Sequence, residues 1–194
     1  MAYDDLREWI KKLDKAGELK RVGEAVDPIL EMAEIADRAA KMGRGTAKAG
    51  GPALLFENVK GYPGASVLMN QFGSERRMKL ALDVDSLDEI AKRIEELMQT
   101  KSPTGFLDKL KMLPKLAEVG AFFPKTIAAK DAPCKQVILR GADVDVLKFP
   151  VLQCWPGDGG RFITLPCVVT RDAKNGKRNV GMYRMQVYDG QTTG

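Results

Sequence analysis

The chain contains no histidine among its 194 residues, which limits the chemistry that its side chains can perform. Serine–histidine and cysteine–histidine nucleophile pairs, and zinc sites with histidine ligands, are therefore excluded. The three cysteines, Cys134, Cys154 and Cys167, lack the spacing of metal ligands, so we expect buried thiols in a reducing cytoplasm. A metal ion bound by this chain would need oxygen ligands.

The charged side chains are unevenly distributed along the sequence. Residues 1–124 hold 20 basic and 20 acidic residues, whereas residues 125–194 hold 11 basic and 6 acidic ones, so the net charge of +5 arises in the last third. A basic last third fits either a solvated surface or a site for a small anion such as phosphate. Nucleic acid is not expected, since no basic stretch is long or interleaved with stacking aromatic residues.

Four helices that could position such a site are predicted in the first part of the sequence. Apolar residues at helical spacing indicate a helix over residues 6–13, which Gly17 ends. An Asp-Pro pair at 27–28 is expected to cap and begin the second helix. A Ser-x-x-Glu capping box at 86–89 precedes the third helix, and residues 104–119 are expected to form a fourth, less regular one.

Short strands are also predicted in this part, at residues 53–57 and 66–70. The small-residue stretch at 43–51 lacks the spacing of a phosphate-binding loop, and we expect it to be a flexible connection. Residues 1–124 are therefore predicted to form a mixed α/β domain. No apolar run is long enough to span a membrane, and the N-terminus does not resemble a signal peptide.

Residues 125–194 are expected to begin a β-rich domain, so the predicted fold class is α+β. A Lys-Asn-Gly-Lys turn at 174–177 joins two strands into a hairpin. The hairpin signal Asp189-Gly190 has only four residues after it, so we expect its partner strand to be missing and the chain to be truncated. The strands are predicted at 136–140, 162–170 and 179–188, with a short helix at 143–149.

Eight short stretches of the sequence form an ordered series, at residues 4–7, 17–21, 35–38, 50–58, 60–62, 132–134, 154–156 and 179–184. In this order and spacing they resemble the UbiD family of prenylated-flavin-dependent decarboxylases. The resemblance covers essentially the whole chain and is closest to the bacterial 4-hydroxy-3-polyprenylbenzoate decarboxylases of quinone biosynthesis. The stretch at 43–51 is longer than the family pattern, which suggests an insertion there.

The resemblance implies a split β-barrel flavin-binding domain beginning at residue 125, and prenylated FMN as the cofactor. In this family a flavin prenyltransferase supplies the cofactor, which bonds to the substrate and accepts the electrons left as carbon dioxide departs, while the protein supplies position, charge and a proton. It also implies an aromatic carboxylic acid as substrate, peripheral membrane association through a lipophilic substrate, and a homo-oligomer for the full-length protein.

The same resemblance assigns roles to the strand at 179–184. Asn179 is expected to ligate a divalent metal, usually manganese, against the cofactor phosphate, with potassium as a second candidate ion. Gly181, Met182, Tyr183 and Arg184 are expected to bind the cofactor. Arg184 is also the expected catalytic residue, beside the substrate carboxylate and paired with acidic residues further along, because a guanidinium binds carboxylates through two N–H groups and stays charged.

Spacing sets a condition on this assignment, because Asn179 and Arg184 are five residues apart and would point to opposite faces of a regular strand. If both face one cofactor, the backbone must bulge or kink, and Gly181 is the expected place. The family's other metal ligands and its glutamates lie beyond the last motif, and no Glu follows Glu118. We therefore expect half a cofactor site and little or no decarboxylase activity from this chain alone.

Three alternatives remain open from the sequence. The substrate could be another aromatic or an unsaturated acid, since substrate choice depends on regions outside this chain. The chain could be a non-catalytic flavin- or phosphate-binding half of a split enzyme. It could also be a basic structural domain without a ligand.

Overall fold

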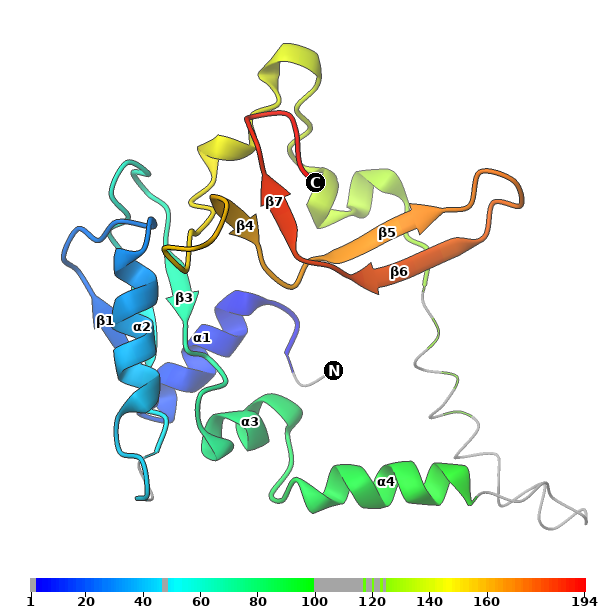
Figure 1. Cartoon of the computed structure of the whole chain (residues 1–194). Helices are drawn as coiled ribbons and strands as arrows, with labels where there is room; N and C mark the ends of the chain where they lie inside the picture. The colour runs from blue at the N-terminus through cyan, green and yellow to red at the C-terminus, as the bar shows by residue number, and fades with distance from the viewer. Residues whose placement is uncertain (1–2, 47–48, 100–116, 118–119, 121–122, 124) are drawn as a thin grey trace, which may run out of the picture. The chain divides into compact units, whose positions relative to one another are not determined.

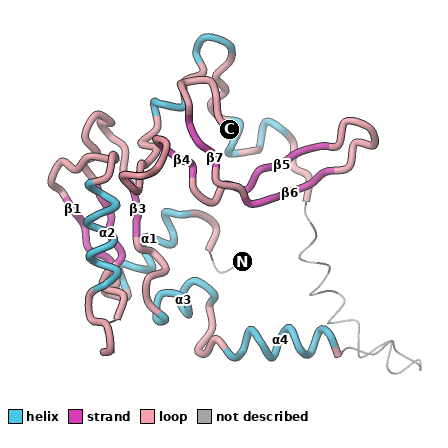
Figure 2. Tube along the Cα trace, in the orientation of Figure 1, coloured by secondary structure: helices cyan, strands magenta, loops and turns pink. Residues whose placement is uncertain are grey.

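The computed structural model describes residues 3–46, 49–99, 117, 120, 123 and 125–194 (Figure 1). The chain forms two compact units, Met1–Asp83 together with Gly141–Gly194, and Val84–Arg140. The described residues contain both helices and small sheets, as Figure 2 shows, which fits the predicted α+β class. The boundary predicted between residues 124 and 125 stays a prediction.

The first unit contains a three-stranded sheet with the order β1-β2-β3. Strand β1 (Leu19–Val22) runs parallel to β2 (Ala53–Phe56), which pairs antiparallel with β3 (Val67–Met69). All four side chains of β2 are buried, as expected for an apolar run in a central strand covered on both faces. The strands predicted at 53–57 and 66–70 are thus confirmed.

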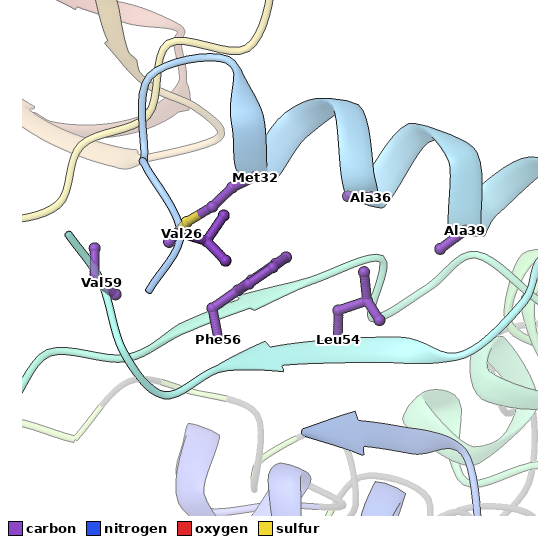
Figure 3. Packing of buried hydrophobic residues seen from close by; sticks show 7 residues of the cluster. All are labelled: Val26, Met32, Ala36, Ala39, Leu54, Phe56 and Val59. Carbon is purple, nitrogen blue, oxygen red and sulfur yellow. The ribbon is translucent and has the colours of Figure 1, made fainter. Parts of the chain in front are cut away.

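Two helices cover this sheet, and alternate residues of β2 contact them. Helix α1 (Leu6–Lys15) places Trp9 and Leu13 in a cluster with Ala53. Helix α2 (Glu31–Lys41) contributes Met32, Ala36 and Ala39 to a second cluster with Leu54 and Phe56, seen in Figure 3. This alternation is the period-two pattern of a strand with two buried faces.

The start of α2 differs from the prediction. The residue before the helix is Leu30, with a φ of 67°, three residues after Asp27. The Asp27 carboxylate accepts a hydrogen bond from the Ile29 N–H at 2.8 Å, so this side chain stabilises the turn ahead of the helix and cannot cap its first turn. The prediction that the Asp-Pro pair begins α2 was therefore wrong by one turn.

A third helix, α3 (Glu75–Leu82), anchors the end of the stretch that was expected to be flexible. Ser74 caps α3 by accepting from the Arg77 N–H. The fully buried Arg77 donates to the carbonyls of Gly50 at 3.0 Å and Gly51 at 2.5 Å. Asn70 donates to the carbonyls of Gly50 and Pro52, both at 2.8 Å. Gly50 and Gly51 are therefore fixed immediately before β2.

The second unit contains helix α4 (Asp88–Met98). One half of its predicted capping box is present, since Ser86 N–H donates to the Glu89 carboxylate at 2.9 Å, whereas the Ser86 hydroxyl accepts from the Asp88 N–H at 3.2 Å and not from that of Glu89. The helix predicted at 104–119 lies outside the described residues. The strand predicted at 136–140 is absent from the described structure, where the 3₁₀ turns η1 (Ala129–Asp131) and η2 (Pro133–Lys135) precede exposed apolar residues without a partner strand.

The last part of the chain returns to the first unit and forms two antiparallel pairs. Strand β4 (Arg161–Ile163) pairs with β7 (Met185–Val187). Strand β5 (Cys167–Arg171) forms the predicted hairpin with β6 (Arg178–Met182). The predicted strands 162–170 and 179–188 are thus each broken in two. In place of the short helix predicted at 143–149 are the 3₁₀ turns η3 (Gly141–Asp143) and η4 (Val146–Lys148).

The hairpin signal at Asp189-Gly190 has its return segment within the chain. Tyr188 N–H donates to the Thr192 carbonyl at 3.0 Å, and Gln186 and Gly194 exchange two backbone hydrogen bonds at 2.8 and 2.9 Å. A return segment thus pairs with β7, and the expectation that the partner of this hairpin is missing was wrong. In the described residues, no helix has the length and hydrophobicity needed to cross a membrane.

Candidate functional site

Arg184 lies where the chain leaves β6 and enters β7, and its guanidinium is held by a carboxylate. Nη1 is 3.1 Å from Oδ1 of Asp158 and Nη2 is 2.8 Å from Oδ2. The Asp158 side chain is 12% exposed, whereas that of Arg184 is 42% exposed. This two-bond geometry fixes the guanidinium plane more firmly than a single contact would, while the Arg184 side chain as a whole stays partly exposed.

An aromatic ring supports the same guanidinium. The Cζ atom of Arg184 lies 3.9 Å from the centroid of the Phe162 ring, a cation–π contact. Phe162 belongs to β4, and the pairing of β4 with β7 places it opposite Gln186, two residues from Arg184. The sheet register therefore brings the ring and the cation together.

The loop that carries Asp158 is ordered by its own hydrogen bonds. Asp158 N–H donates to the Trp155 carbonyl at 3.1 Å, and Trp155 N–H donates to the Asp158 carboxylate at 3.2 Å. Gln186 then donates to the Gly159 carbonyl at 2.7 Å. A Cβ on Gly159 would lie 2.8 Å from the Gln186 side-chain nitrogen, so a glycine here lets the loop approach β7 closely.

The Arg184 guanidinium and the Asp158 carboxylate stabilise each other's charged form. The hydrogen bonds from Arg184 lower the pKa of Asp158, and Asp158 in turn raises the pKa of Arg184. Both groups therefore stay ionised over a wide pH range. The Cys154 thiol has a raised pKa, first because it is partly buried and second because of the Asp158 charge, while Arg184 acts in the opposite direction.

Three of the other predicted site residues, Asn179, Gly181 and Met182, lie on β6, and Tyr183 follows directly after it. Strand β6 pairs regularly with β5 through Gly181, with Asn179 opposite Thr170 and Gly181 opposite Val168. Asn179 and Gly181 therefore share one face, and Met182 points to the other. The ring of Tyr183 covers Gly181, since a Cβ there would lie 2.4 Å from the ring.

The predicted kink at Gly181 was therefore wrong, because the strand is regular there and ends one residue later, at Met182. Tyr183 and Arg184 belong to the connection between β6 and β7. Strand parity then no longer determines whether Asn179 and Arg184 face one ligand. Among the interactions of the described residues, none joins these two side chains. Their shared site stays a prediction.

The residues present fit one part of a metal site. Asn179 is exposed and offers one amide oxygen, a ligand that a hard divalent cation accepts. Across the described residues, His, Cys, Asp and Glu form no group of three that could hold a metal. The described part of this chain can therefore provide one ligand, and a complete metal site needs further oxygen donors from outside it.

The expected cysteine environment was wrong. Cys134 and Cys167 are exposed and Cys154 is partly buried. Cys167 begins β5, a strand whose side chains are exposed or half-buried, so its thiol faces no core. Cys154 begins the loop that holds Asp158.

The functional residues that sequence reasoning missed are Asp158 and Phe162. Asp158 stands between Gly157 and Gly159, directly after the Cys-Trp-Pro stretch of the family pattern. An acidic residue between glycines beside a motif was a usable signal. Phe162 had none, because only the β4–β7 pairing places it at Arg184. The acidic partner of Arg184 in the structure, Asp158, precedes it in the sequence, whereas the family resemblance predicted acidic partners that follow it.

A separate cavity of about 670 Å³ occurs in the same unit. It is lined in part by Asp27, Lys60, Lys148 and Arg161, and Arg161 donates a hydrogen bond to the Tyr62 hydroxyl. None of the five predicted site residues lines it. The candidate site is therefore the partly open surface at Arg184 and β6, and this cavity is not part of it.

Comparisons with known proteins point in one direction. Two family models match the chain: the 3-octaprenyl-4-hydroxybenzoate carboxy-lyase N-terminal domain over residues 10–97, and the 3-octaprenyl-4-hydroxybenzoate carboxy-lyase Rift-related domain over residues 125–194. A relative described as an uncharacterized protein of Archaeoglobus fulgidus is 52% identical over the whole chain. The chain spans 37% of the length of this relative.

The chain also matches a part of several longer proteins whose structures have been solved. Vanillic acid decarboxylase of Sedimentibacter hydroxybenzoicus is 31% identical with a TM-score of 0.71, and the match covers 99% of this chain and 36% of that one. An evolved dimeric form of the UbiD-class enzyme HmfF from Pelotomaculum thermopropionicum, in complex with prFMN, is 28% identical with a TM-score of 0.70. That match covers 97% of this chain and 37% of that one.

Proposed function

This chain belongs to the UbiD family, and from that premise we propose that it forms one part of a carboxy-lyase that uses prenylated FMN to decarboxylate an aromatic acid. The observation that carries the proposal is Arg184, a permanently charged guanidinium held by Asp158 and Phe162 and still 42% exposed. Such a cation can bind and orient a substrate carboxylate.

The proposed roles follow the residues. Arg184 binds the carboxylate that the substrate loses, and Asn179 contributes one oxygen ligand to a manganese ion beside the cofactor phosphate, with potassium as a second candidate ion. Gly181, Met182 and Tyr183 contact the cofactor. The bound cofactor supplies the electron sink for decarboxylation. The remaining metal ligands and the acid–base groups are proposed to come from outside this chain, so the chain alone is expected to show no turnover.

The proposed substrate is 4-hydroxy-3-polyprenylbenzoate in quinone biosynthesis, which agrees with the descriptions of both matching family models. A second candidate is another aromatic acid, since a protein 31% identical to this chain is named a vanillic acid decarboxylase. A flavin prenyltransferase is the proposed cofactor supplier. Peripheral membrane association with a lipophilic substrate and homo-oligomerisation of the longer protein complete the proposal.

A chimera tests the proposal directly. This chain replaces the matching part of the Archaeoglobus fulgidus relative, with which it aligns over all 194 residues. The chimera is produced together with a flavin prenyltransferase and manganese. We expect a flavin absorbance spectrum and carbon dioxide release from at least one acid of a panel containing prenylated hydroxybenzoates and vanillate. A folded chimera without bound flavin would contradict the proposal.

Single substitutions in the chimera separate the two roles. Asn179→Ala is expected to lower the manganese and flavin content. Arg184→Gln is expected to abolish carbon dioxide release while flavin remains bound. Arg140→Gln, at an exposed arginine outside the candidate site, is the control and is expected to change neither. Equal activity of the Arg184→Gln and Arg140→Gln proteins would refute the role of Arg184.

A further inference from the structure

The hydrogen bonds of Arg184 use only one edge of its guanidinium. A guanidinium has five N–H donors, arranged on an edge between its two Nη atoms and on a side edge that includes Nε. Asp158 occupies the edge between Nη1 and Nη2 with two hydrogen bonds, and Phe162 covers one face. Among the described residues, no second carboxylate contacts Arg184 and no hydrogen bond from Nε is present.

The holding carboxylate is itself fixed. The Asp158 side chain is only 12% exposed, and its Oδ2 also accepts from Trp155 N–H at 3.2 Å. The loop is tied to β7 through the Gln186–Gly159 hydrogen bond, two residues beyond Arg184. Asp158 is therefore held by its loop, and its two hydrogen bonds together with the Phe162 ring hold the plane of the Arg184 guanidinium.

We propose that Asp158 is a positioning residue, which occupies the Nη edge of Arg184 and so directs the Nε edge toward the carboxylate of the aromatic acid. This inference rests on the proposed function of Arg184 and adds the residue that sets the substrate's orientation. The planar carboxylate can form two parallel hydrogen bonds with the Nε edge while Asp158 keeps its own two. The substrate then binds without displacing Asp158.

Loss of Asp158 has a specific consequence. Arg184 remains charged and still attracts the substrate, but it can present either edge and the carboxylate can bind in several orientations. Because misorientation slows the chemical step more than it weakens binding, Asp158→Asn should lower kcat by roughly tenfold or more and change KM little. Asp158→Glu, which keeps the charge on a side chain one methylene longer, should recover part of the lost kcat.

The pair can be tested in the chain itself, without substrate or cofactor. Cys154 serves as a reporter, because Asp158 raises its pKa and Arg184 lowers it. With Cys134 and Cys167 replaced by serine, the alkylation rate of Cys154 with iodoacetamide is measured against pH. The midpoint gives the thiol pKa independently of how accessible the thiol is.

The two substitutions should shift this midpoint in opposite directions. Asp158→Asn removes the anion and leaves the cation, so the pKa of Cys154 should fall and alkylation at a fixed pH below the midpoint should be roughly two- to fivefold faster. Arg184→Gln should raise the pKa and slow alkylation. Asp143→Asn, at an exposed acid outside the cluster, should leave it unchanged. Unchanged midpoints for both cluster variants would overturn the proposal, since the pair would then not exist in solution.

Kinetics in the chimera separate the failure of this inference from the failure of the proposed function. If Arg184→Gln leaves carbon dioxide release intact, the proposed function itself fails. If Arg184→Gln abolishes release but Asp158→Asn keeps the original kcat, the function stands and the positioning role of Asp158 is refuted. A lowered kcat with little change in KM, together with partial recovery in Asp158→Glu, supports the role.

Discussion

Replacing the buried Arg77 with glutamine is expected to destabilise the protein by about 3 kcal/mol. The Arg77 side chain is fully buried and donates to Glu18 at 2.9 Å, in addition to the carbonyls of Gly50 and Gly51. Glutamine is too short to reach all three acceptors. Asn70 still donates to Gly50 and Arg76 still contacts Glu18, but the Gly51 carbonyl loses its donor. The lost hydrogen bond and the void left by the shorter side chain each cost free energy.

The neighbouring Arg76 provides a matched control. It contacts the other oxygen of the same acid, Glu18, at 2.9 Å, but its side chain is 66% exposed. An exposed ion pair contributes about 0–1 kcal/mol. Both substitutions therefore remove one positive charge beside the Glu18 carboxylate. Arg76→Gln removes it from an exposed position, and Arg77→Gln removes it from a buried one.

Urea unfolding followed by tryptophan fluorescence measures the difference. Trp9 is buried in the same unit and donates to Gln71, so its emission reports loss of the packing around the sheet. We expect the Arg77→Gln midpoint to fall well below that of Arg76→Gln, with a melting temperature lower by roughly 6–12 °C for a chain of this size. Equal midpoints for the two variants would refute the assignment of Arg77 as the residue that holds the Gly50–Gly51 turn.

Two further predictions concern the candidate site. Gly181→Ala places a methyl group 2.4 Å from the Tyr183 ring, but this side chain is 53% exposed, so the ring can move away and stability in urea unfolding should change by no more than about 0.5 kcal/mol. A loss of several kcal/mol that the additional Tyr183→Leu substitution relieves would show that the ring is held in place. Because Arg184 lowers the pKa of Asp158 in the folded protein, the stabilisation is present above the unfolded-state pKa of about 3.9 and is lost as pH falls through the lower folded pKa. As the pH is lowered from about 5 to 2, the melting temperature of Asp158→Asn should therefore fall less than that of the original protein. An equal fall in both proteins would count against the ion pair.

Elements whose signals are local could be predicted from the sequence. Helix α1, the central strand β2, the capping box ahead of α4 and the β5–β6 hairpin lie where periodicity and turn residues placed them. The family was also recognisable, because its motifs are short runs of neighbouring residues. Each of these features depends on interactions within a few residues, which a sequence displays directly.

Elements that depend on a distant partner could not be predicted in this way. The apolar run at 136–140 has strand composition but no pairing strand in the described structure, and the run at 162–170 is divided because Leu165, with a φ of 61°, precedes Pro166. A strand is stable only where another strand satisfies its backbone hydrogen bonds, and composition does not reveal that partner.

The sequence by itself determined the family and the α+β character, and the resemblance to that family singled out Arg184 as the residue proposed to bind a carboxylate. Only the tertiary structure decided what holds Arg184. Asp158 is 26 residues away in the chain and Phe162 lies on a different strand, and the Cys154–Gly160 loop and the β4–β7 register bring both to the guanidinium. Such contacts arise from long-range pairing and packing, which no pattern within a short stretch of sequence records.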